Sequence, residues 1–260
     1  MRLSCYLIVK NEENRLERTL RAAAKVADEI VVVDSGSTDG TLDIARRYTD
    51  KVVFHEWKSY CDQKHYAETL CSNDWVLMLD ADEVLSEPLI DEINAFKAAG
   101  PKAGAYNLRI VNMYPFDDKP QLFSKSFNVV RLYDKTRCTL PPDKQNKDRV
   151  FVPKGVKIGQ MKEKVLHYSL LSLEQAVAKY NEHSSELMRM MREKGRRVSA
   201  FRLYIEWPLR FVRYFFFQGY FLTGTRGFMQ AVVLTTFRWL KIAKVYEAQL
   251  AEEAEKKRKR

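Results

Sequence analysis

The sequence predicts an α/β protein whose mostly parallel sheet is sandwiched by helices, followed by a helical appendage. Short apolar runs rich in β-branched residues alternate with helical patterns through the first hundred residues. This alternation is typical of βαβ units, which place parallel strands in one sheet with helices on both faces. Beyond residue 170 the pattern becomes helical and rich in aromatic residues and arginine.

The first hundred residues contain four predicted strands, over Leu3–Val9, Ile30–Asp34, Val52–Phe54 and Trp75–Asp80. Each is followed by a predicted helix, over 12–25, 41–48, 62–71 and 88–99. Leu16, Leu20 and Ala24 give the first helix an apolar face. Pro88 suits the first turn of the last helix, where its missing N–H costs no hydrogen bond.

The second half predicts further short strands and then helices. The strands are Ala105–Val111, Asn128–Tyr133 and Val150–Val152, and a polar loop with two prolines spans 139–148. Ser172 and Gln175 form a capping box for a helix that continues to Lys194, with Gly195 as its stop. Residues 199–247 are predicted to be helical. We therefore expect a catalytic domain over 1–170, a helical region over 171–250 and a frayed basic tail over 251–260.

Charge is distributed unevenly along the chain. Residues 1–100 carry 12 Lys and Arg against 19 Asp and Glu, whereas residues 101–260 carry 32 against 15. The basic second part predicts an anionic partner, such as a membrane surface, phosphate or nucleic acid. The four cysteines show neither CxxC spacing nor close histidines, which argues against a disulfide framework or a zinc site and favours a reducing compartment.

The sequence predicts no membrane-spanning segment. The apolar run Leu3–Val9 is short and leads directly into charged residues, unlike a signal peptide. The most apolar stretch, 203–223, is interrupted by Glu206, Arg210 and Arg213, and a spanning helix needs about 18 or more uncharged apolar residues. We expect a protein that is cytosolic or lies on a membrane.

Three polar loops follow the carboxyl ends of predicted parallel strands, where open α/β sheets place their ligand sites. They span Lys10–Glu12, Asp34–Thr41 and Asp80–Glu83. Two carboxylates at positions i and i+2 can divide the work, since one can bind ribose hydroxyls and the other a hard divalent cation. An isolated Asp-x-Asp motif is weak evidence for such a site, because a chain of this composition contains about one such motif by chance. The joint order of strand, glycine-rich loop, helix, strand and paired carboxylates is specific.

On these loops and several further stretches, the chain resembles the family 2 glycosyltransferases, and within them the lipopolysaccharide-core β-glycosyltransferases. The resemblance covers most of the chain and implies a GT-A fold, a nucleotide-sugar donor, a divalent cation (Mg²⁺ or Mn²⁺) and inversion at the sugar carbon. The stretches that carry it are Leu7–Glu12, Ala27–Thr41, Trp57, Gln63, Lys64, Ala67, Asp74–Glu83, Leu166–Tyr168 and Gly219–Phe228.

The resemblance also implies roles for individual residues. Asp34 resembles the carboxylate that binds the uracil edge, with Ser35 beside it. Lys64 resembles a basic nucleotide contact, and Asp80 resembles the ribose ligand, with Ala81 after it. The donor pocket would be bordered by Lys10, Asn11 and Glu12. The metal ligands would be Asp82 and His167, although a lone histidine is as often a packed core residue.

The general base is left open, because the acidic pair that relatives carry on a later loop has no clean equivalent here. That region reads Asp143-Lys-Gln-Asn-Lys-Asp-Arg149. Three carboxylates therefore stay candidates for the base: Glu83, Asp143 and Asp148.

Residues 201–246 combine many aromatic side chains with arginine. They could pack on a core, enter a membrane interface beside anionic lipid, or bind nucleic acid. We favour the membrane, because a lipid-linked saccharide acceptor requires work at a surface, and expect no nucleic-acid partner. The predicted protein is then a peripheral enzyme on the cytoplasmic face of the inner membrane.

Two other functions compete with glycosyl transfer. A nucleotidyltransferase shares the α/β layout and paired carboxylates, but it needs a glycine- and lysine-rich phosphate loop that Val9–Glu13 does not provide. A non-enzymatic basic adaptor does not explain why carboxylates gather at strand ends.

Overall fold

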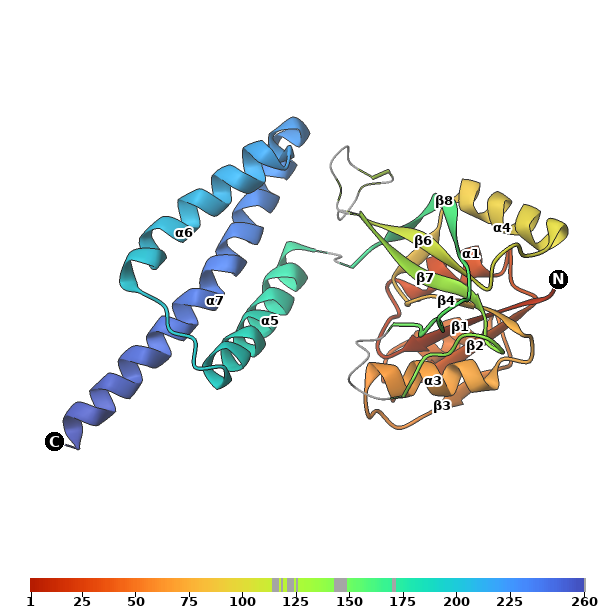
Figure 1. Cartoon of the computed structure of the whole chain (residues 1–260), viewed down its shortest axis with the longest axis horizontal. Helices are drawn as coiled ribbons and strands as arrows, with labels where there is room; N and C mark the ends of the chain where they lie inside the picture. The colour runs from red at the N-terminus through yellow and green to blue at the C-terminus, as the bar shows by residue number, and fades with distance from the viewer. Residues whose placement is uncertain are drawn as a thin grey trace. The chain divides into compact units, whose positions relative to one another are not determined.

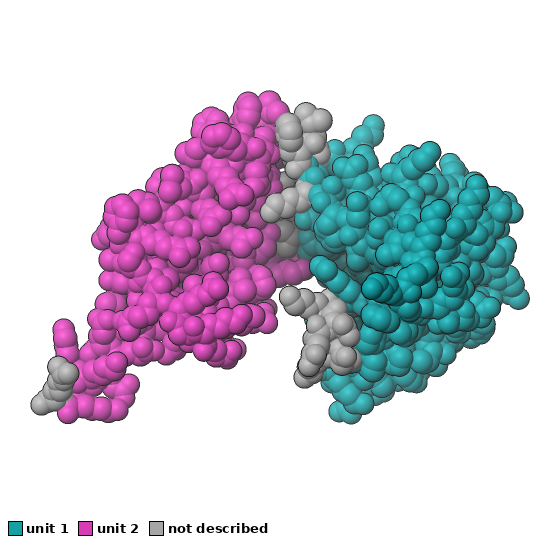
Figure 2. All heavy atoms as spheres, viewed as in Figure 1, with its two compact units in different colours: residues 1–120, 124–169 teal, residues 121–123, 170–260 magenta. Residues whose placement is uncertain are grey.

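The computed structural model describes residues 1–113, 117, 119–120, 124, 126–142, 149–169 and 172–259. The chain divides into two compact units, shown in different colours in Figure 2. Unit 1 comprises residues 1–120 and 124–169, and unit 2 comprises residues 121–123 and 170–260.

Unit 1 is built on an eight-stranded sheet of order β3-β2-β1-β4-β7-β6-β8-β5 (Figure 1). Its first four strands in this order are mutually parallel, whereas β7 is antiparallel to both β4 and β6, and β5 to β8. The predicted α/β class is confirmed, with the parallel pairing concentrated in the N-terminal half. The strands are β1 Leu3–Val9, β2 Glu29–Asp34, β3 Val52–Phe54, β4 Trp75–Met78, β5 Glu83–Leu85, β6 Ala105–Asn112, β7 Ser126–Asp134 and β8 Ile158–His167.

Helices of unit 1 contribute to cores on both faces of the sheet. They are α1 Leu16–Ala23, α2 Thr41–Arg46, α3 Tyr60–Leu70 and α4 Glu87–Ala99. Side chains of α1, α2 and α4 pack with Leu3, Cys5 and Leu7 of β1, while α3 packs on the face that holds Tyr6. This division follows from the alternation of side chains along a strand. Ser59 caps α3 through the Asp62 amide at 3.1 Å, which starts this helix two residues earlier than predicted.

Unit 2 is helical, with α5 Leu173–Glu193, α6 Ala200–Val212 and α7 Gly224–Arg258. A π-helical turn, η2 Arg213–Phe217, and a 3₁₀ turn, η3 Tyr220–Thr223, connect α6 to α7. The predicted capping residue Ser172 accepts a hydrogen bond from the Gln175 amide at 3.1 Å. Gly195 has a φ of 63° just after α5, as predicted for its stop.

The structure corrects three sequence predictions. Residues 150–152 form no strand; Phe151 makes only an isolated bridge with Thr139. Strands β5 and β8 were not predicted. The tail predicted to be frayed continues α7 to Arg258, because Ala, Glu, Lys and Arg are all strong helix formers. Among the described residues, no helix combines the length and apolar character needed to cross a membrane.

Candidate functional site

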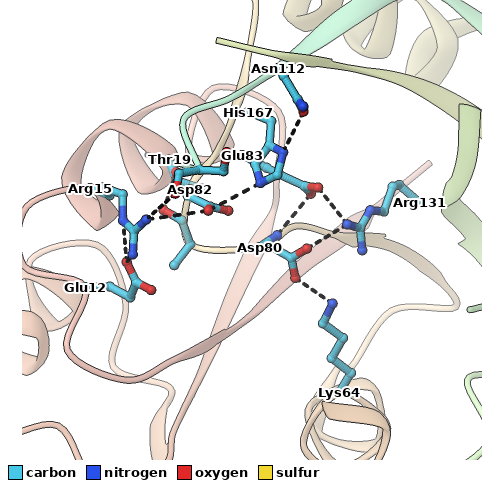
Figure 3. Close-up of polar contacts among 12 residues, drawn as sticks. Glu12, Arg15, Thr19, Lys64, Asp80, Asp82, Glu83, Asn112, Arg131 and His167 are labelled. Atoms are coloured by element: carbon cyan, nitrogen blue, oxygen red, sulfur yellow. Dashed lines mark hydrogen bonds and ion pairs between the residues drawn. The ribbon is translucent and has the colours of Figure 1, made fainter. Parts of the chain in front are cut away.

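The parallel pairing of β2, β1 and β4 brings their carboxyl ends to one edge of the sheet. Val9 of β1 pairs with Asp34 of β2, and Tyr6 of β1 pairs with Met78 of β4. The three polar loops predicted from the sequence therefore lie at the same edge. Figure 3 shows the polar contacts that join the loop after β4 to α1, α3, β7 and β8.

Asp34 is buried, with 4% of its surface exposed, and its carboxylate organises the loop that follows β2. Its oxygens accept hydrogen bonds from the Gly36 amide at 2.8 Å and the Ser37 amide at 3.1 Å. Gly36 has a φ of 97°, a conformation that side-chain-bearing residues rarely adopt. The Ser35 amide donates to the Val9 carbonyl at 3.1 Å, which joins this loop to β1.

The loop after β1 is hydrogen-bonded to the loop after β2. Asn11, at a φ of 54°, accepts a hydrogen bond from the Thr38 amide at 2.8 Å. The Glu12 amide donates to the Thr41 hydroxyl at 2.7 Å. Lys10 lies exposed beside them. These contacts make one polar rim from two segments that are 27 to 29 residues apart in the chain.

Asp80 is held between two buried cations. Its carboxylate lies 2.5 Å from Lys64 Nζ and 2.7 Å from an Arg131 nitrogen. Burial by itself would raise the pKa of Asp80, but Arg131 and Lys64 outweigh it and hold this pKa well below its ordinary value. Lys64 is only 1% exposed. It was predicted as a nucleotide contact, and the structure places its ammonium against Asp80.

Glu83 belongs to the same charge network and is also buried, at 1% exposed. One carboxylate oxygen lies 2.6 Å from Arg131, and the other accepts a hydrogen bond from the Asp80 amide at 3.1 Å. Burial raises the pKa of Glu83, and Arg131 opposes that shift. The geometry makes Glu83 a support for the Asp80 loop.

Asp82 faces away from this cation pair and towards His167 on β8. The two side chains approach to 3.3 Å, between Asp82 Oδ2 and His167 Nε2, while His167 Nδ1 lies 3.2 Å from the Asn112 side-chain oxygen. Burial opposes both shifts, yet the contact between the two side chains lowers the pKa of Asp82 and raises that of His167. Two carboxylates two residues apart thus have different partners.

Arg15, at the start of α1, joins the first loop to the Asp82 loop. Its guanidinium pairs with Glu12 at 2.6 Å and lies 3.7 Å from Asp82. Neither Arg15 nor Arg131 was predicted as a site residue. The available signal for Arg131 was a single charged residue within the apolar strand Asn128–Tyr133. Its carboxylate partners lie about fifty residues earlier in the chain, so the sequence does not identify them.

The donor set of Asp82 and His167 fits a divalent cation that takes its other ligands from substrate. Within the described ranges, no three His, Cys, Asp or Glu side chains come together as a complete metal site. Carboxylate oxygen suits Mg²⁺ and Mn²⁺, and cations at phosphate-transfer sites usually keep substrate or water ligands. Asp80 is less suited to this role, because Lys64 and Arg131 already neutralise its charge.

The structure therefore gathers most of the predicted site residues at one edge. Ala81 is fixed through its carbonyl, which accepts a hydrogen bond from the Thr19 hydroxyl at 2.8 Å. Two of the three candidates for the base, Asp143 and Asp148, lie outside the described residues.

An α/β sheet with carboxylates at the carboxyl ends of its parallel strands has the layout of α/β proteins that bind a ligand at that edge. The model of glycosyl transferase family 2 matches residues 4–150, which include every strand-end loop described above. The chain belongs to glycosyl transferase family 2 and is a glycosyltransferase. This result excludes the two competing functions, nucleotidyl transfer and a non-enzymatic adaptor role.

Similar proteins match the chain beyond residues 4–150. An uncharacterised glycosyltransferase of Rickettsia conorii is 37% identical over 96% of this chain and 91% of its own length. The lipopolysaccharide core biosynthesis glycosyltransferase LpsC of Rhizobium meliloti is 28% identical over 94% of this chain and 92% of its own. Residues 1–349 of TarS of S. aureus, solved with UDP-GlcNAc, align with a TM-score of 0.48 at 15% identity, covering 95% of this chain and 84% of theirs.

Proposed function

We propose that this enzyme is an inverting, divalent-cation-dependent hexosyltransferase. It would move a hexose from a UDP-sugar to a saccharide on a lipid-linked glycan, such as the core of lipopolysaccharide. The proposal rests on the different surroundings of two carboxylates that follow β4. Asp80 lies against cations, whereas Asp82 lies against a histidine. The name of LpsC supports the class of acceptor.

The donor nucleotide would lie across the carboxyl ends of β1, β2 and β4. Asp34 has its loop-facing oxygens engaged by amides and, as a carboxylate, has remaining acceptor capacity for the N–H of a uracil ring. Asp80 would accept hydrogen bonds from ribose hydroxyls, with Lys64 and Arg131 fixing its orientation. Lys10, Asn11, Glu12, Ser35 and Ala81 would border this pocket.

Asp82 and His167 would hold Mg²⁺ or Mn²⁺ beside the donor phosphates. A cation at this place neutralises the charge that develops on the departing nucleoside diphosphate. Asn112 fixes the orientation of His167, and Arg15 adds a fixed positive charge near Asp82. Such supporting contacts orient ligands and tune their charge.

Inversion requires a base that removes the proton of the attacking acceptor hydroxyl. Glu83 is enclosed by Arg131 and the Asp80 amide, which favours a positioning role over direct proton transfer. We therefore infer that the base is one of the other two candidates, Asp143 or Asp148. No covalent intermediate is needed.

Attachment to an anionic membrane would bring the enzyme to its acceptor. Large apolar side chains are exposed from α6 to the start of α7, including Tyr204 at 79% and Phe217 at 83% exposed. Basic side chains lie nearby, and burial, followed by Arg238 and Arg202, lowers the pKa of Lys241. This combination is typical of interfacial helices. We propose peripheral binding at the cytoplasmic face of the inner membrane.

Nucleotide-dependent stabilisation tests the donor assignment. We expect UDP to raise the melting temperature of the full chain more than GDP does, and Asp34→Ala to abolish this preference. Asp34→Asn keeps one oxygen that can accept from the loop amides and replaces the other with an NH2 donor, so it should also lose the preference while folding normally. Asp43→Ala, which removes an exposed carboxylate of α2, is the matched control and should keep it. Equal stabilisation of the wild-type protein by UDP and GDP would contradict the proposal.

A further inference from the structure

A basic hollow lies within unit 2, between the end of α5, the turn that follows it, and α7. Its volume is about 460 Å³. Four arginines line it: Arg189, Arg192, Arg196 and Arg197. None of these residues belongs to the catalytic edge of unit 1, and the proposed donor chemistry does not use them.

The hollow is supported by a fixed turn. The Val198 amide donates to the Gln249 side-chain oxygen at 2.7 Å, and the Gln249 amide group donates to the Val198 carbonyl at 2.9 Å. Val198 is buried with Ile242 and Val245 of α7. These contacts hold the turn, and therefore the two arginines that precede Val198, against α7. The backbone that carries Arg196 and Arg197 is therefore fixed in place.

Positive charge exceeds negative charge around the hollow. Its lining contains only two acidic residues, Glu193 and Glu252. Arg192 pairs with Glu252 at 2.5 Å, and Arg197 pairs with Glu253 at 2.9 Å. Arg189 and Arg196 have no carboxylate partner in the portion of the chain that the structure describes. Two guanidinium groups are therefore left to interact with an external anion.

We propose that this hollow binds a phosphoryl group. Guanidinium groups present several N–H donors in a planar fork that matches phosphate oxygens, and bonds between charged partners are the stronger hydrogen bonds. The group could be carried by a phospholipid headgroup or be free phosphate, since both offer the same oxygens. Arg189 and Arg196 would bind it directly, and the carboxylate-paired Arg192 and Arg197 would complete its surroundings.

The test compares two double variants of the full chain. Arg189→Gln/Arg196→Gln removes two charges from the hollow, and Lys256→Gln/Lys257→Gln removes two charges from the exposed end of α7. Each protein is titrated with inorganic phosphate, and with phosphatidylcholine vesicles containing either phosphatidic acid or phosphatidylserine. Circular dichroism verifies the fold. Any phosphate bound at the catalytic edge affects both variants equally.

We expect the hollow variant to bind a phosphate-bearing probe about tenfold more weakly than the α7 variant, a loss that corresponds to about 1.4 kcal/mol. Loss with inorganic phosphate identifies free phosphate as a ligand. Loss with vesicles of either lipid but not with inorganic phosphate identifies a lipid headgroup. If the two variants bind all three probes equally, the proposed site is overturned. The comparison does not depend on donor binding, so its outcome is separable from that of the UDP test.

Discussion

Unit 1 buries charge, whereas unit 2 exposes apolar side chains. At the end of β4, Asp80 and Glu83 share Arg131, a cation that is 6% exposed. In unit 2, large apolar side chains face solvent over α6, η2, η3 and the first turns of α7. They are Phe201, Tyr204, Leu209, Val212, Phe216, Phe217, Phe221, Leu222, Phe228 and Met229.

The two departures from ordinary burial have different physical meanings. A buried charge must be paired, so the network around Asp80 fixes the geometry of a site at a cost in desolvation. A large exposed apolar surface is typical of a site that binds a membrane or another molecule. The buried charges of unit 1 thus have their partners within the unit, whereas the exposed apolar side chains of unit 2 form the surface that we propose to bind a membrane.

Removing the shared cation of unit 1 should have the largest effect. In Arg131→Met, Asp80 keeps Lys64 but Glu83 is left as a buried carboxylate without its cation. We expect the free energy of unfolding to fall by about 3–5 kcal/mol, the usual cost of breaking a buried ion pair. Urea denaturation followed by circular dichroism measures it.

Arg109→Met is the matched control, since Arg109 is exposed on β6 and contacts only the Ser126 hydroxyl among the hydrogen bonds described. It should change stability by about 0.5 kcal/mol or less. Combining Arg131→Met with Glu83→Gln should cost less than the sum of the single changes, because the uncompensated charge is removed. A loss below about 1 kcal/mol in Arg131→Met would show that the network does not hold the site together.

Changing the apolar face of unit 2 should affect membrane binding and leave stability nearly unchanged. In Phe216→Ser/Phe217→Ser we expect binding to vesicles of phosphatidylcholine and phosphatidylglycerol to weaken about tenfold to a hundredfold. Because both rings are exposed, at 55% and 83%, the free energy of unfolding should change by about 0.5 kcal/mol or less.

The control for this prediction is Phe127→Ser/Phe151→Ser, which changes two exposed phenylalanines of unit 1. It should bind vesicles like the wild-type protein. If unit 2's variant loses several kcal/mol of stability and no vesicle affinity, its aromatic side chains are part of a core.

Glu29 is a paired carboxylate of unit 1 that lies away from the site. It therefore tests whether paired charges stabilise unit 1 outside the site as well. Burial would raise its pKa, but hydrogen bonds from Lys51, Ser4 and Ser72 outweigh it and lower the pKa to about 2. A depressed pKa in the folded state stabilises the protein above the unfolded value of about 4.5, and this contribution is lost as pH falls towards 2.

We expect the ionised Glu29 to contribute about 1–2 kcal/mol at neutral pH, after allowance for solvent screening. Glu29→Gln should therefore lower stability at pH 7, and the difference from wild type should shrink as pH decreases from 4.5 to 2. Urea midpoints across this pH range measure the effect. If the difference in stability between Glu29→Gln and the wild-type protein stays constant with pH, the variant loses packing and not a charge interaction.

The sequence predicted the parallel half of the sheet well because its strands are continuous apolar runs. β1 and β4 are almost wholly buried, so every residue contributes to the signal. β8 was missed because only Met161 and Val165 among its residues are buried, which gives no alternating pattern. β5 is three residues long and directly follows the polar loop after β4, so it is too short to show the alternation of apolar and polar residues that marks a strand.

The candidate site was predictable only where it follows strand ends. Asp34, Asp80 and Asp82 are placed by local sequence order and by a rule of parallel sheets. Lys64 and Arg131 could not be assigned as partners of Asp80, because they come from a helix and a strand whose approach is set by packing of the whole sheet. The different environments of Asp80 and Asp82 appear only when these long-range neighbours are in place.

The difference between these two carboxylates is the central claim, and the metal dependence of nucleotide binding tests it most directly. Calorimetric titration of the full chain with UDP should show at least about tenfold tighter binding in Mn²⁺ than in EDTA, equivalent to about 1.4 kcal/mol. Asp82→Asn should keep the fold and the metal-free affinity but lose the increment, because one charge on the cation is removed. Asp43→Asn, at an exposed position of α2, should retain it. An Asp82→Asn protein that binds UDP with the full Mn²⁺ increment would contradict the assignment.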